Sequence, residues 1–391
     1  MSTVKSGRII LAAILAILVY GMIAATLGTL LPSFNLTPEQ SGNVAFAQAL
    51  GLIIASVSVG PLIDSKGKKT GLLLGLGMAA VALFLLPSAG SYDATMGLMF
   101  LLGLGGGIIV TGANALAGDV NEARRASTLN LLNLFFGLGG LLTPLIAKYF
   151  FSGNAVSLCY LVAALTGFTL LVHTATTMPR PTGERGFKLS EVGVVVRNPA
   201  LYLLALFLFL YVACEVGMWN WLAKHLIAQG IPESQALLIL SLGFALGILV
   251  GRVVVSRILI RIAAPTVTLA CAVLMAATTY LVLQTRDPSV AWVAVFCAGV
   301  AMAPVFPTTL AMAGDAFPKA TATAMGIVIT SGWIGLAVSS KIIGAVAGGD
   351  DKRLGTALLV LPAFSVLMVL VNTALRPARA KPPELGLGPE L

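Results

Sequence analysis

The chain alternates between long apolar runs and short polar turns from one end to the other. Each run holds about twenty residues, the length that a helix needs to cross the hydrocarbon core of a bilayer. The pattern predicts twelve membrane-spanning helices, over residues 9–31, 40–62, 70–88, 95–118, 127–150, 155–177, 200–223, 234–256, 265–284, 290–313, 321–346 and 355–376. The first run is too long for the apolar core of a signal peptide, so we interpret it as the first span.

Composition agrees with a membrane protein. The 391 residues are 58% hydrophobic and only 10% charged, which is too apolar for a soluble protein of this length. The 42 glycines suit membrane helices whose backbones approach closely. Outer-membrane barrels use alternating strands of about ten residues, unlike these runs. The predicted fold class is therefore an all-α membrane protein.

The cations predict an orientation. An even number of spans puts both termini on one side of the membrane. If that side is the cytoplasm, 18 of the 24 Lys and Arg residues fall in inner segments, as the excess of basic residues in inner loops requires. We expect both termini to be cytoplasmic, in a membrane of the bacterial inner (plasma) type. The net charge of +9 then reflects topology, and we expect no nucleic-acid partner.

The longest polar interruption follows the sixth span and contains Pro179, Pro181 and Gly183. It divides the chain into an N-terminal six-helix bundle (1–178), a cytoplasmic linker (179–199) and a C-terminal six-helix bundle (200–391). The basic turn GRVVVSRILIR after span eight occupies the same place in the second half as the turn after span two in the first. Two pseudo-symmetric bundles of this kind are typical of transporters.

The turn after span two reads GPLIDSKGKK. It resembles the loop between helices 2 and 3 of major facilitator superfamily transporters, and the matching residues are Gly60, Leu62, Asp64, Gly67, Lys68 and Lys69. The similarity to this superfamily extends over nearly the whole chain. It implies the major facilitator fold, alternating access, and a central cavity between spans one, four, seven and ten.

Charged residues near the inner ends of the spans are candidates for a gate between the halves. Arg252 in span eight, and Arg124 with Arg125 after span four, are placed where they could meet Asp64 or Asp119. Such pairs would latch the halves while the cavity opens outward and break when it opens inward; the alternative is that these cations only set the topology. The predicted cytoplasmic gate consists of Gly60, Asp64, Gly67, Lys68, Lys69, Arg124 and Arg252.

Glu215, in span seven, is the only carboxylate far from either end of a span. A charge at the bilayer centre costs about 2.5–3.5 kcal/mol on insertion scales, so it should face a wet cavity or a partner. Tyr211, Glu215 and Trp219 are four residues apart and share one helix face, with Asn220 beside them. An aromatic ring beside a carboxylate suits a sugar. The alternatives are a Glu215 that only fastens two helices and a Trp219 that belongs to the interfacial aromatic belt.

Three amides lie inside spans. Asn114 and Asn133, in spans four and five, either bond one another across a close helix pair or meet a polar ligand, since buried amides need partners. Gln48 in span two is open to the same two interpretations. The predicted substrate-binding residues are Gln48, Asn114, Asn133, Tyr211, Glu215, Trp219 and Asn220.

Span ten carries Pro304 and Pro307, which kink a membrane helix and free backbone carbonyls. Such a segment suits an element that bends during alternating access, and a static kink is equally compatible with it.

The sequence offers few candidate catalytic side chains. Only His173 and His225 are available, and no Ser or Cys has a base nearby in sequence. The four cysteines fall inside apolar runs without ligand spacing. We expect no enzyme activity, metal or cofactor, and a monomer in the lipid bilayer whose partner is a small-molecule substrate. A receptor or scaffold would be expected to carry a large soluble domain or long tails.

Parts of the chain resemble the fucose:proton symporter family within the superfamily. They are Asn114 in span four, Asn133, Gly137, Gly139 and Pro144 in span five, Glu215 ahead of a Trp-Leu pair, and PVFPTTLA from Pro304. The resemblance implies a sugar, most simply a monosaccharide. The chain departs from the family where Gly28 and Val110 replace its two proton-coupling carboxylates. This leaves Glu215 to couple transport to H+ or Na+, or leaves an uncoupled uniporter; a drug or metabolite exporter of the same fold is the other candidate.

Overall fold

The computed structural model describes residues 3–30, 38–152, 154–178, 192–347 and 351–380, and every regular element within them is helical. Twelve segments among these residues are long and apolar enough to cross a membrane, which confirms the predicted number of spans. The boundaries shift by a few residues. The second span, expected over 40–62, is a helix that continues to Lys66.

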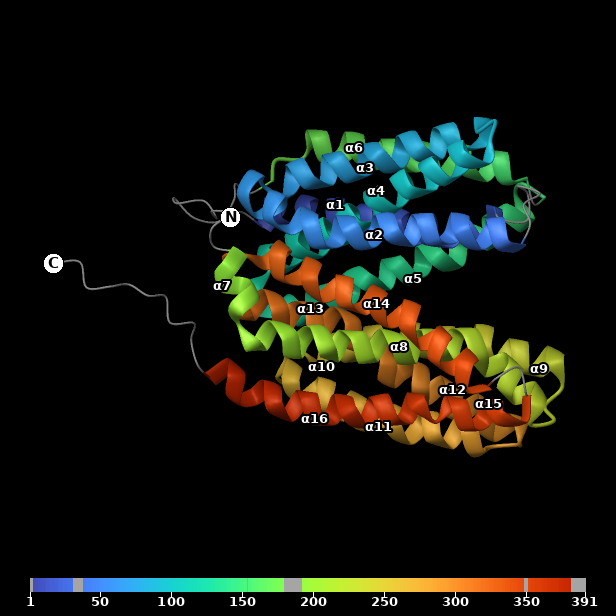
Figure 1. Cartoon of the computed structure of the whole chain (residues 1–391). Coiled ribbons are helices and arrows are strands. Elements are labelled where there is room, and N and C mark those ends of the chain that lie inside the picture. The colour runs from blue at the N-terminus through green and yellow to red at the C-terminus, as the bar shows by residue number, and fades with distance from the viewer. Residues whose placement is uncertain (1–2, 31–37, 153, 179–191, 348–350, 381–391) are drawn as a thin grey trace.

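The helices of the first half form one lobe (Figure 1). They are α1 (Thr3–Leu30), α2 (Pro38–Lys66), α3 (Lys68–Leu85), α4 (Tyr92–Val120), α5 (Arg125–Tyr149) and α6 (Ala155–Ala175), with the 3-10 turns η2 (Leu86–Ser88) and η3 (Glu122–Arg124). Within this lobe α2 packs on α4, α1 on α5, and α3 on both α4 and α6.

The second lobe contains more helical pieces because three of its spans are broken. Its elements are α8 (Pro199–Ala228), α9 (Glu233–Leu238), the π-helix η5 (Ile239–Phe244), α10 (Ala245–Ile258), α11 (Ala264–Gln284), α12 (Pro288–Met302), α13 (Val305–Ala316), α14 (Thr321–Ala347), α15 (Asp351–Leu358) and α16 (Val360–Ala380). Here α8 packs on α14 and α16, and α10 and α11 pack on α12.

The predicted linker, 179–199, lies mostly outside the described residues. Its last part forms the short helix α7 (Val192–Arg197), followed directly by α8. Proline at the first position of α8 and the Asn198 side chain, which accepts a hydrogen bond from the Ala200 N–H, start this helix in the usual way. The predicted domain boundaries remain a prediction.

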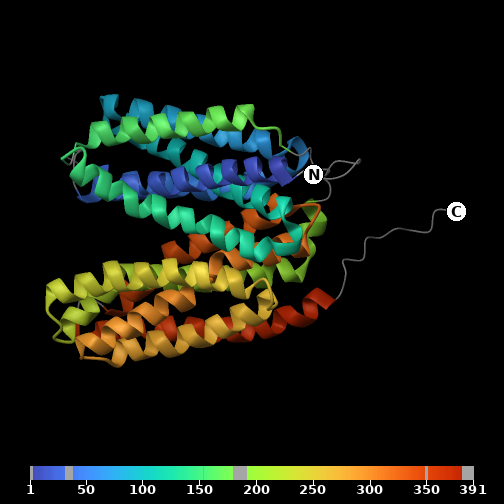
Figure 2. The ribbon, with the colours of Figure 1, turned by 180° about the vertical axis from the view of Figure 1, so that it is seen from behind.

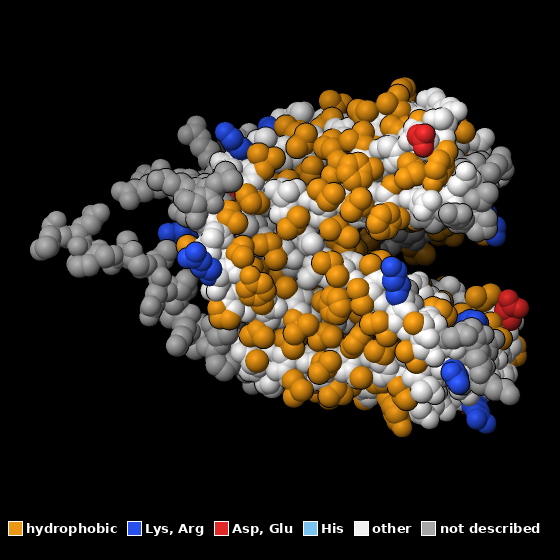
Figure 3. Space-filling view, in the orientation of Figure 1, with side chains coloured by type: hydrophobic (Ala, Val, Ile, Leu, Met, Phe, Trp, Pro, Cys, Tyr) orange, Lys and Arg blue, Asp and Glu red, His pale blue; other side chains and the backbone are white. Residues whose placement is uncertain are grey.

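The start of α1 and the end of α16 lie at the same end of the molecule, here called the terminus end (Figures 1 and 2). The turns between α2 and α3, between α4 and α5, and between α13 and α14 also lie there. The two lobes meet at this end, and the surface is notched between them at the opposite end (Figure 3). The space-filling view shows hydrophobic side chains over the flank and most Lys and Arg side chains toward the two ends, as a membrane-embedded body requires.

Glycines allow the closest helix contacts. A Cβ on Gly103 of α4 would overlap the Gln48 carbonyl of α2, and one on Gly139 of α5 would overlap the Leu18 carbonyl of α1. A glycine also permits close contact between the lobes, because a Cβ on Gly326 of α14 would overlap the Ser56 backbone carbonyl of α2. Close backbone approach of this kind is how membrane helices gain packing energy.

Candidate functional site

A cavity of about 110 Å³ lies between the two lobes. Its polar lining consists of Asn133 from α5, Glu215 from α8 and Arg252 from α10. Four aromatic side chains complete it, and they are Tyr20, Phe136, Phe306 and Trp333 from α1, α5, α13 and α14. Charged, amide and aromatic groups from both halves therefore converge on one small space.

Glu215 is half-buried and lines this cavity. Tyr211, one turn earlier on α8, is completely buried. The described residues that line the cavity do not include Tyr211. The structure thus brings Glu215 to the lobe interface, and it keeps Tyr211 within the packed interior.

The two asparagines bond one another. Asn133 Nδ2 donates to Asn114 Oδ1 at 2.8 Å and to the Leu129 carbonyl at 2.9 Å, and Asn114 Nδ2 donates to the Val110 carbonyl at 2.8 Å. Asn133 also lines the cavity, whereas Asn114 is fully buried behind it. Asn114 therefore orients Asn133 from the α4 side.

Arg252 requires a correction. The sequence places it near the cytoplasmic end of span eight, beside Asp64 or Asp119, but α10 continues to Ile258. The side chain is only 6% exposed and lines the central cavity. Its Nε donates to the Ala303 carbonyl at 3.4 Å and its Nη1 to the Asn133 carbonyl. It enters none of the ion pairs found among the described residues.

The remaining predicted substrate residues lie away from this cavity. Trp219 is 38% exposed and packs edge-to-face on Phe244 of η5, with ring centroids 5.0 Å apart. Asn220 follows it and is exposed. Gln48 is half-buried in α2, where its backbone carbonyl faces Gly103 of α4. Among the described lining residues, none of these three appears.

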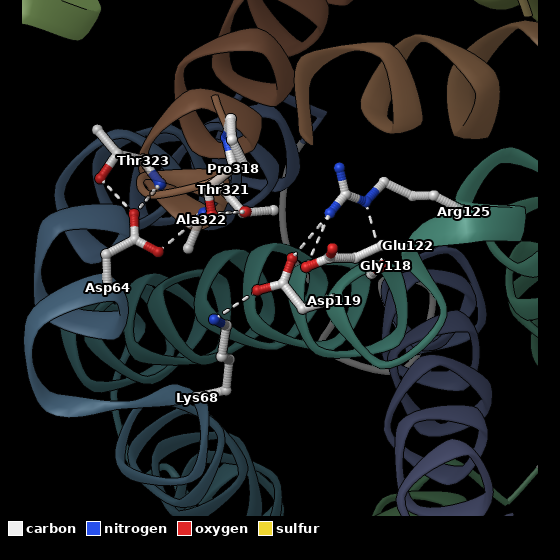
Figure 4. A network of polar contacts seen from close by, with 10 residues as sticks. All are labelled: Asp64, Lys68, Gly118, Asp119, Glu122, Arg125, Pro318, Thr321, Ala322 and Thr323. Carbon is white, nitrogen blue, oxygen red and sulfur yellow. Dashed lines mark hydrogen bonds and ion pairs between the residues drawn. The ribbon is translucent and has the colours of Figure 1, made fainter. Parts of the chain in front are cut away.

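At the terminus end, Asp64 of α2 closes the first turn of α14 across the lobe interface (Figure 4). Its carboxylate accepts hydrogen bonds from the Ala322 N–H at 3.1 Å, the Thr323 N–H at 2.8 Å and the Thr323 hydroxyl at 2.7 Å. The first N–H groups of a helix lack internal partners and carry partial positive charge, so a carboxylate stabilises them. Gly60, one turn earlier, lets α2 approach because a Cβ there would overlap the Thr323 backbone.

A second contact joins the lobes through Arg125, which is 3% exposed at the start of α5. It donates to the Gly118 carbonyl at 3.1 Å, pairs with Asp119 at 3.3 Å, and reaches Asp315 of the second lobe at 2.8 Å. Lys68 holds the other side of Asp119 at 2.5 Å (Figure 4). Of the adjacent pair Arg124 and Arg125, the predicted gate included Arg124, which the structure leaves exposed in η3.

The other two gate residues act within the first lobe. Gly67 has a φ of 98°, a backbone conformation that favours glycine, and it separates α2 from α3. Lys69 Nζ donates to the carbonyls of Thr174 at 2.7 Å and Thr176 at 3.1 Å, at the end of α6. Cations are favourable at a helix C-terminus, so Lys69 ties the turn to α6.

Sequence reasoning missed the four cavity aromatics. Tyr20 and Phe136 lie with ring centroids 5.3 Å apart, but nothing in the sequence separates them from aromatic residues elsewhere in the spans. Within the described part of the chain, no cluster of three His, Cys, Asp or Glu side chains could hold a metal ion.

Comparisons with known proteins agree with this architecture. The family model described as Major Facilitator Superfamily matches residues 9–384. The chain is 26% identical to the glucose/mannose transporter GlcP of Bacillus subtilis, over 92% of both chains. It is 24% identical to the Saccharomyces cerevisiae protein named bypass of stop codon protein 6, over 86% of this chain and 76% of that one.

Among solved structures, the transporter FucP in its outward conformation superimposes with a TM-score of 0.83 and 18% identity, covering 94% of this chain and 98% of that chain. A second structure of FucP names it as the E. coli fucose:proton symporter. At this identity the likeness shows the fold alone. The matched family and these transporters agree with the expectation that the chain is not an enzyme.

Proposed function

We propose that this chain, which belongs to the Major Facilitator Superfamily, transports a small neutral polar solute, and specifically a monosaccharide, by alternating access. The observation that carries the proposal is the cavity between the lobes, where Glu215 and Asn133 meet four aromatic side chains. The function rests on this site, because the fold alone serves many substrates.

The lining matches the chemistry of a sugar. A carboxylate accepts hydrogen bonds from hydroxyls, an amide both donates and accepts, and aromatic rings cover the apolar C–H faces. The relative GlcP is named a glucose/mannose transporter and the structural neighbour FucP a fucose symporter, and both names support the same class of substrate. Neither fixes which sugar this chain carries.

The small size of the cavity supports a mechanism in which the two lobes move apart. Its volume of about 110 Å³ is far below the roughly 300–1,000 Å³ of pockets for drug-sized ligands. The lobes must therefore separate further to admit a hexose. Contacts at the terminus end and a notch at the other end favour entry from the notched side (Figure 3).

Glu215 is our candidate for coupling to H+ or Na+. Val110 lines the cavity, and it stands at the span-four position where the resemblance to the fucose symporters implies a coupling carboxylate, so this chain has an apolar group there. We further propose that the terminus end faces the cytoplasm of a bacterial-type inner membrane, because most basic turns would then lie inside, and that the chain works as a monomer.

The test is uptake of a panel of labelled hexoses and pentoses into proteoliposomes that contain the purified protein, with protein-free liposomes as the control. Saturable uptake of one sugar, inhibited by the unlabelled sugar, supports the proposal. No uptake of any sugar, together with resistance of an expressing host to toxic hydrophobic cations, would favour an exporter.

A further inference from the structure

Arg252 donates hydrogen bonds to backbone carbonyls of both lobes at once. One acceptor is Ala303 in the second lobe, and the other is Asn133 of α5 in the first. Arg252 is buried and lines the cavity. Among the described residues that line the cavity, no other side chain bonds the opposite lobe.

The acceptor at Ala303 is free because of Pro307. In a regular helix the N–H of residue 307 would bond the carbonyl of residue 303, but proline has no N–H. The span breaks there, with α12 ending at Met302 and α13 starting at Val305. Gly251 brings α10 close to this break, since a Cβ there would lie 2.7 Å from the Val300 carbonyl oxygen. Arg252 therefore supplies the donor that Pro307 lacks.

The acceptor at Asn133 lies one turn before Gly137. A Cβ at Gly137 would lie 3.4 Å from Leu249 and 3.8 Å from Arg252 Nη1, which are ordinary contact distances, so the guanidinium packs against this face of α5. A carbonyl oxygen has two lone pairs and can accept this bond beside a helical one. The side chain of the same Asn133 lines the cavity.

Arg252 thus shares one cavity with Glu215 while it holds the lobes together. A guanidinium has five N–H donors, and the two carbonyl bonds use two of them. A ligand that offers hydroxyl oxygens, or the Glu215 carboxylate itself, competes for the group that bridges the lobes.

We propose that Arg252 is a releasable bridge: substrate in the cavity draws its guanidinium from the Asn133 carbonyl, and this loss lets α5 and α10 part at the terminus end. The inference rests on the proposed function only in that the occupant is the transported solute. A ligand shifts a conformational equilibrium only by binding the two states unequally. The bridge supplies that difference, because the guanidinium bonds α5 in one state and the solute in the other.

The experiment measures the separation of the lobes directly. Lys66 and Lys319 are exposed at the terminus end, one on each lobe, and each is replaced by Cys for spin labelling. Cys297 is exposed and is replaced by Ser, whereas Cys159, Cys214 and Cys271 are buried. Double electron–electron resonance then gives the fraction of molecules with a long label distance, for this background and for the variants Arg252→Gln and Arg257→Gln. Arg257 is the matched control, since it lies on the same helix and is exposed.

We expect Arg252→Gln to raise the ratio of long-distance to short-distance molecules about tenfold without any sugar, which corresponds to roughly 1.4 kcal/mol for one charged hydrogen bond. Arg257→Gln should leave it within twofold of the background. Pro307→Ala gives a second test that keeps both cavity charges. The restored N–H competes with Arg252 for Ala303, so the guanidinium loses the second-lobe acceptor that orients it toward the Asn133 carbonyl. It should raise the same ratio about threefold.

Ratios within twofold of the background for both Arg252→Gln and Pro307→Ala would overturn the inference. If Arg252→Gln does not yield folded protein, Pro307→Ala decides. The distances measured without sugar do not depend on the substrate, so the Arg252 bridge and the monosaccharide assignment can be tested independently. Sugar uptake with unchanged distances sinks the bridge alone, and changed distances without sugar uptake sink the monosaccharide assignment alone.

Discussion

Asp64 and Thr323 are joined by two hydrogen bonds to one carboxylate oxygen, from the Thr323 backbone N–H at 2.8 Å and its hydroxyl at 2.7 Å, across the interface between the lobes. Asp64 lies in α2 and Thr323 in the first turn of α14, so the side chain of one lobe completes a helix of the other. Opening the terminus end must break this contact. The closed state therefore depends on a carboxylate at that position.

Asp64→Asn should weaken the closed terminus end. A neutral amide keeps one acceptor oxygen and loses the charge that favours the α14 N-terminus, at a cost of about 1–2 kcal/mol, or roughly five- to thirtyfold in the equilibrium. Initial sugar uptake should fall by a similar factor. Asp93→Asn, at an exposed first-turn position of α4, is the control. Equal uptake by the two variants would contradict the role of Asp64.

Arg125→Gln should destabilise the protein more than Arg124→Gln. The Arg125 side chain is buried against Asp119 and Asp315, and removing it leaves Asp119 with Lys68 alone, at a cost of about 2 kcal/mol. The neighbouring Arg124 is exposed. Thermal unfolding in detergent should give a lower midpoint for Arg125→Gln only. Matching midpoints would mean that the interlobe pair contributes little.

At the terminus end, the sequence predicted some of the gate residues but not their partners. The loop pattern identified Asp64 and the basic turn, but its partners are backbone N–H groups of α14, which carry no residue signature. Arg124 and Arg125 are adjacent, and only the 3-10 turn η3 decides which of them points inward. Counting charges along the sequence does not predict that turn.

Gly326→Ala should force α2 and α14 apart. The added Cβ would overlap the Ser56 carbonyl oxygen, a backbone atom that cannot rotate away, and overpacking of this kind costs about 1–3 kcal/mol. Gly77→Ala, in open space on α3, should be neutral or stabilising by up to about 1 kcal/mol. Unfolding midpoints of the two variants check this. A Gly326→Ala protein as stable as Gly77→Ala would show that the close contact is dispensable.

Asn133→Ala should weaken sugar binding about tenfold, since it removes a cavity amide worth roughly 1–1.5 kcal/mol. Gln48→Ala should change affinity less than twofold, because Gln48 does not line the cavity in the described structure. Equilibrium binding of labelled sugar to the purified variants measures both. A larger loss with Gln48→Ala would place the binding site elsewhere.

The amides and Arg252 mark the limits of sequence reasoning in the cavity. Helical spacing left open whether Asn114 and Asn133 bond one another or a ligand, and the structure joins them at 2.8 Å with Asn133 alone in the cavity lining. Arg252 was misplaced because the basic turn suggested a helix end, whereas it lies six residues before Ile258, about 9 Å along the helix axis. The bond to Ala303 depends on a break in another span, which no local pattern reveals.

The central claim is that Glu215 couples sugar movement to an ion, and one measurement tests it most directly. Proteoliposomes with wild-type protein, Glu215→Gln or the control Glu233→Gln, an exposed residue at the start of α9, take up labelled sugar under imposed H+ or Na+ gradients. We predict accumulation against the sugar gradient for the wild type and the control, and only downhill equilibration for Glu215→Gln. Equal accumulation by Glu215→Gln, or equilibration without accumulation in all three proteins, would contradict the claim.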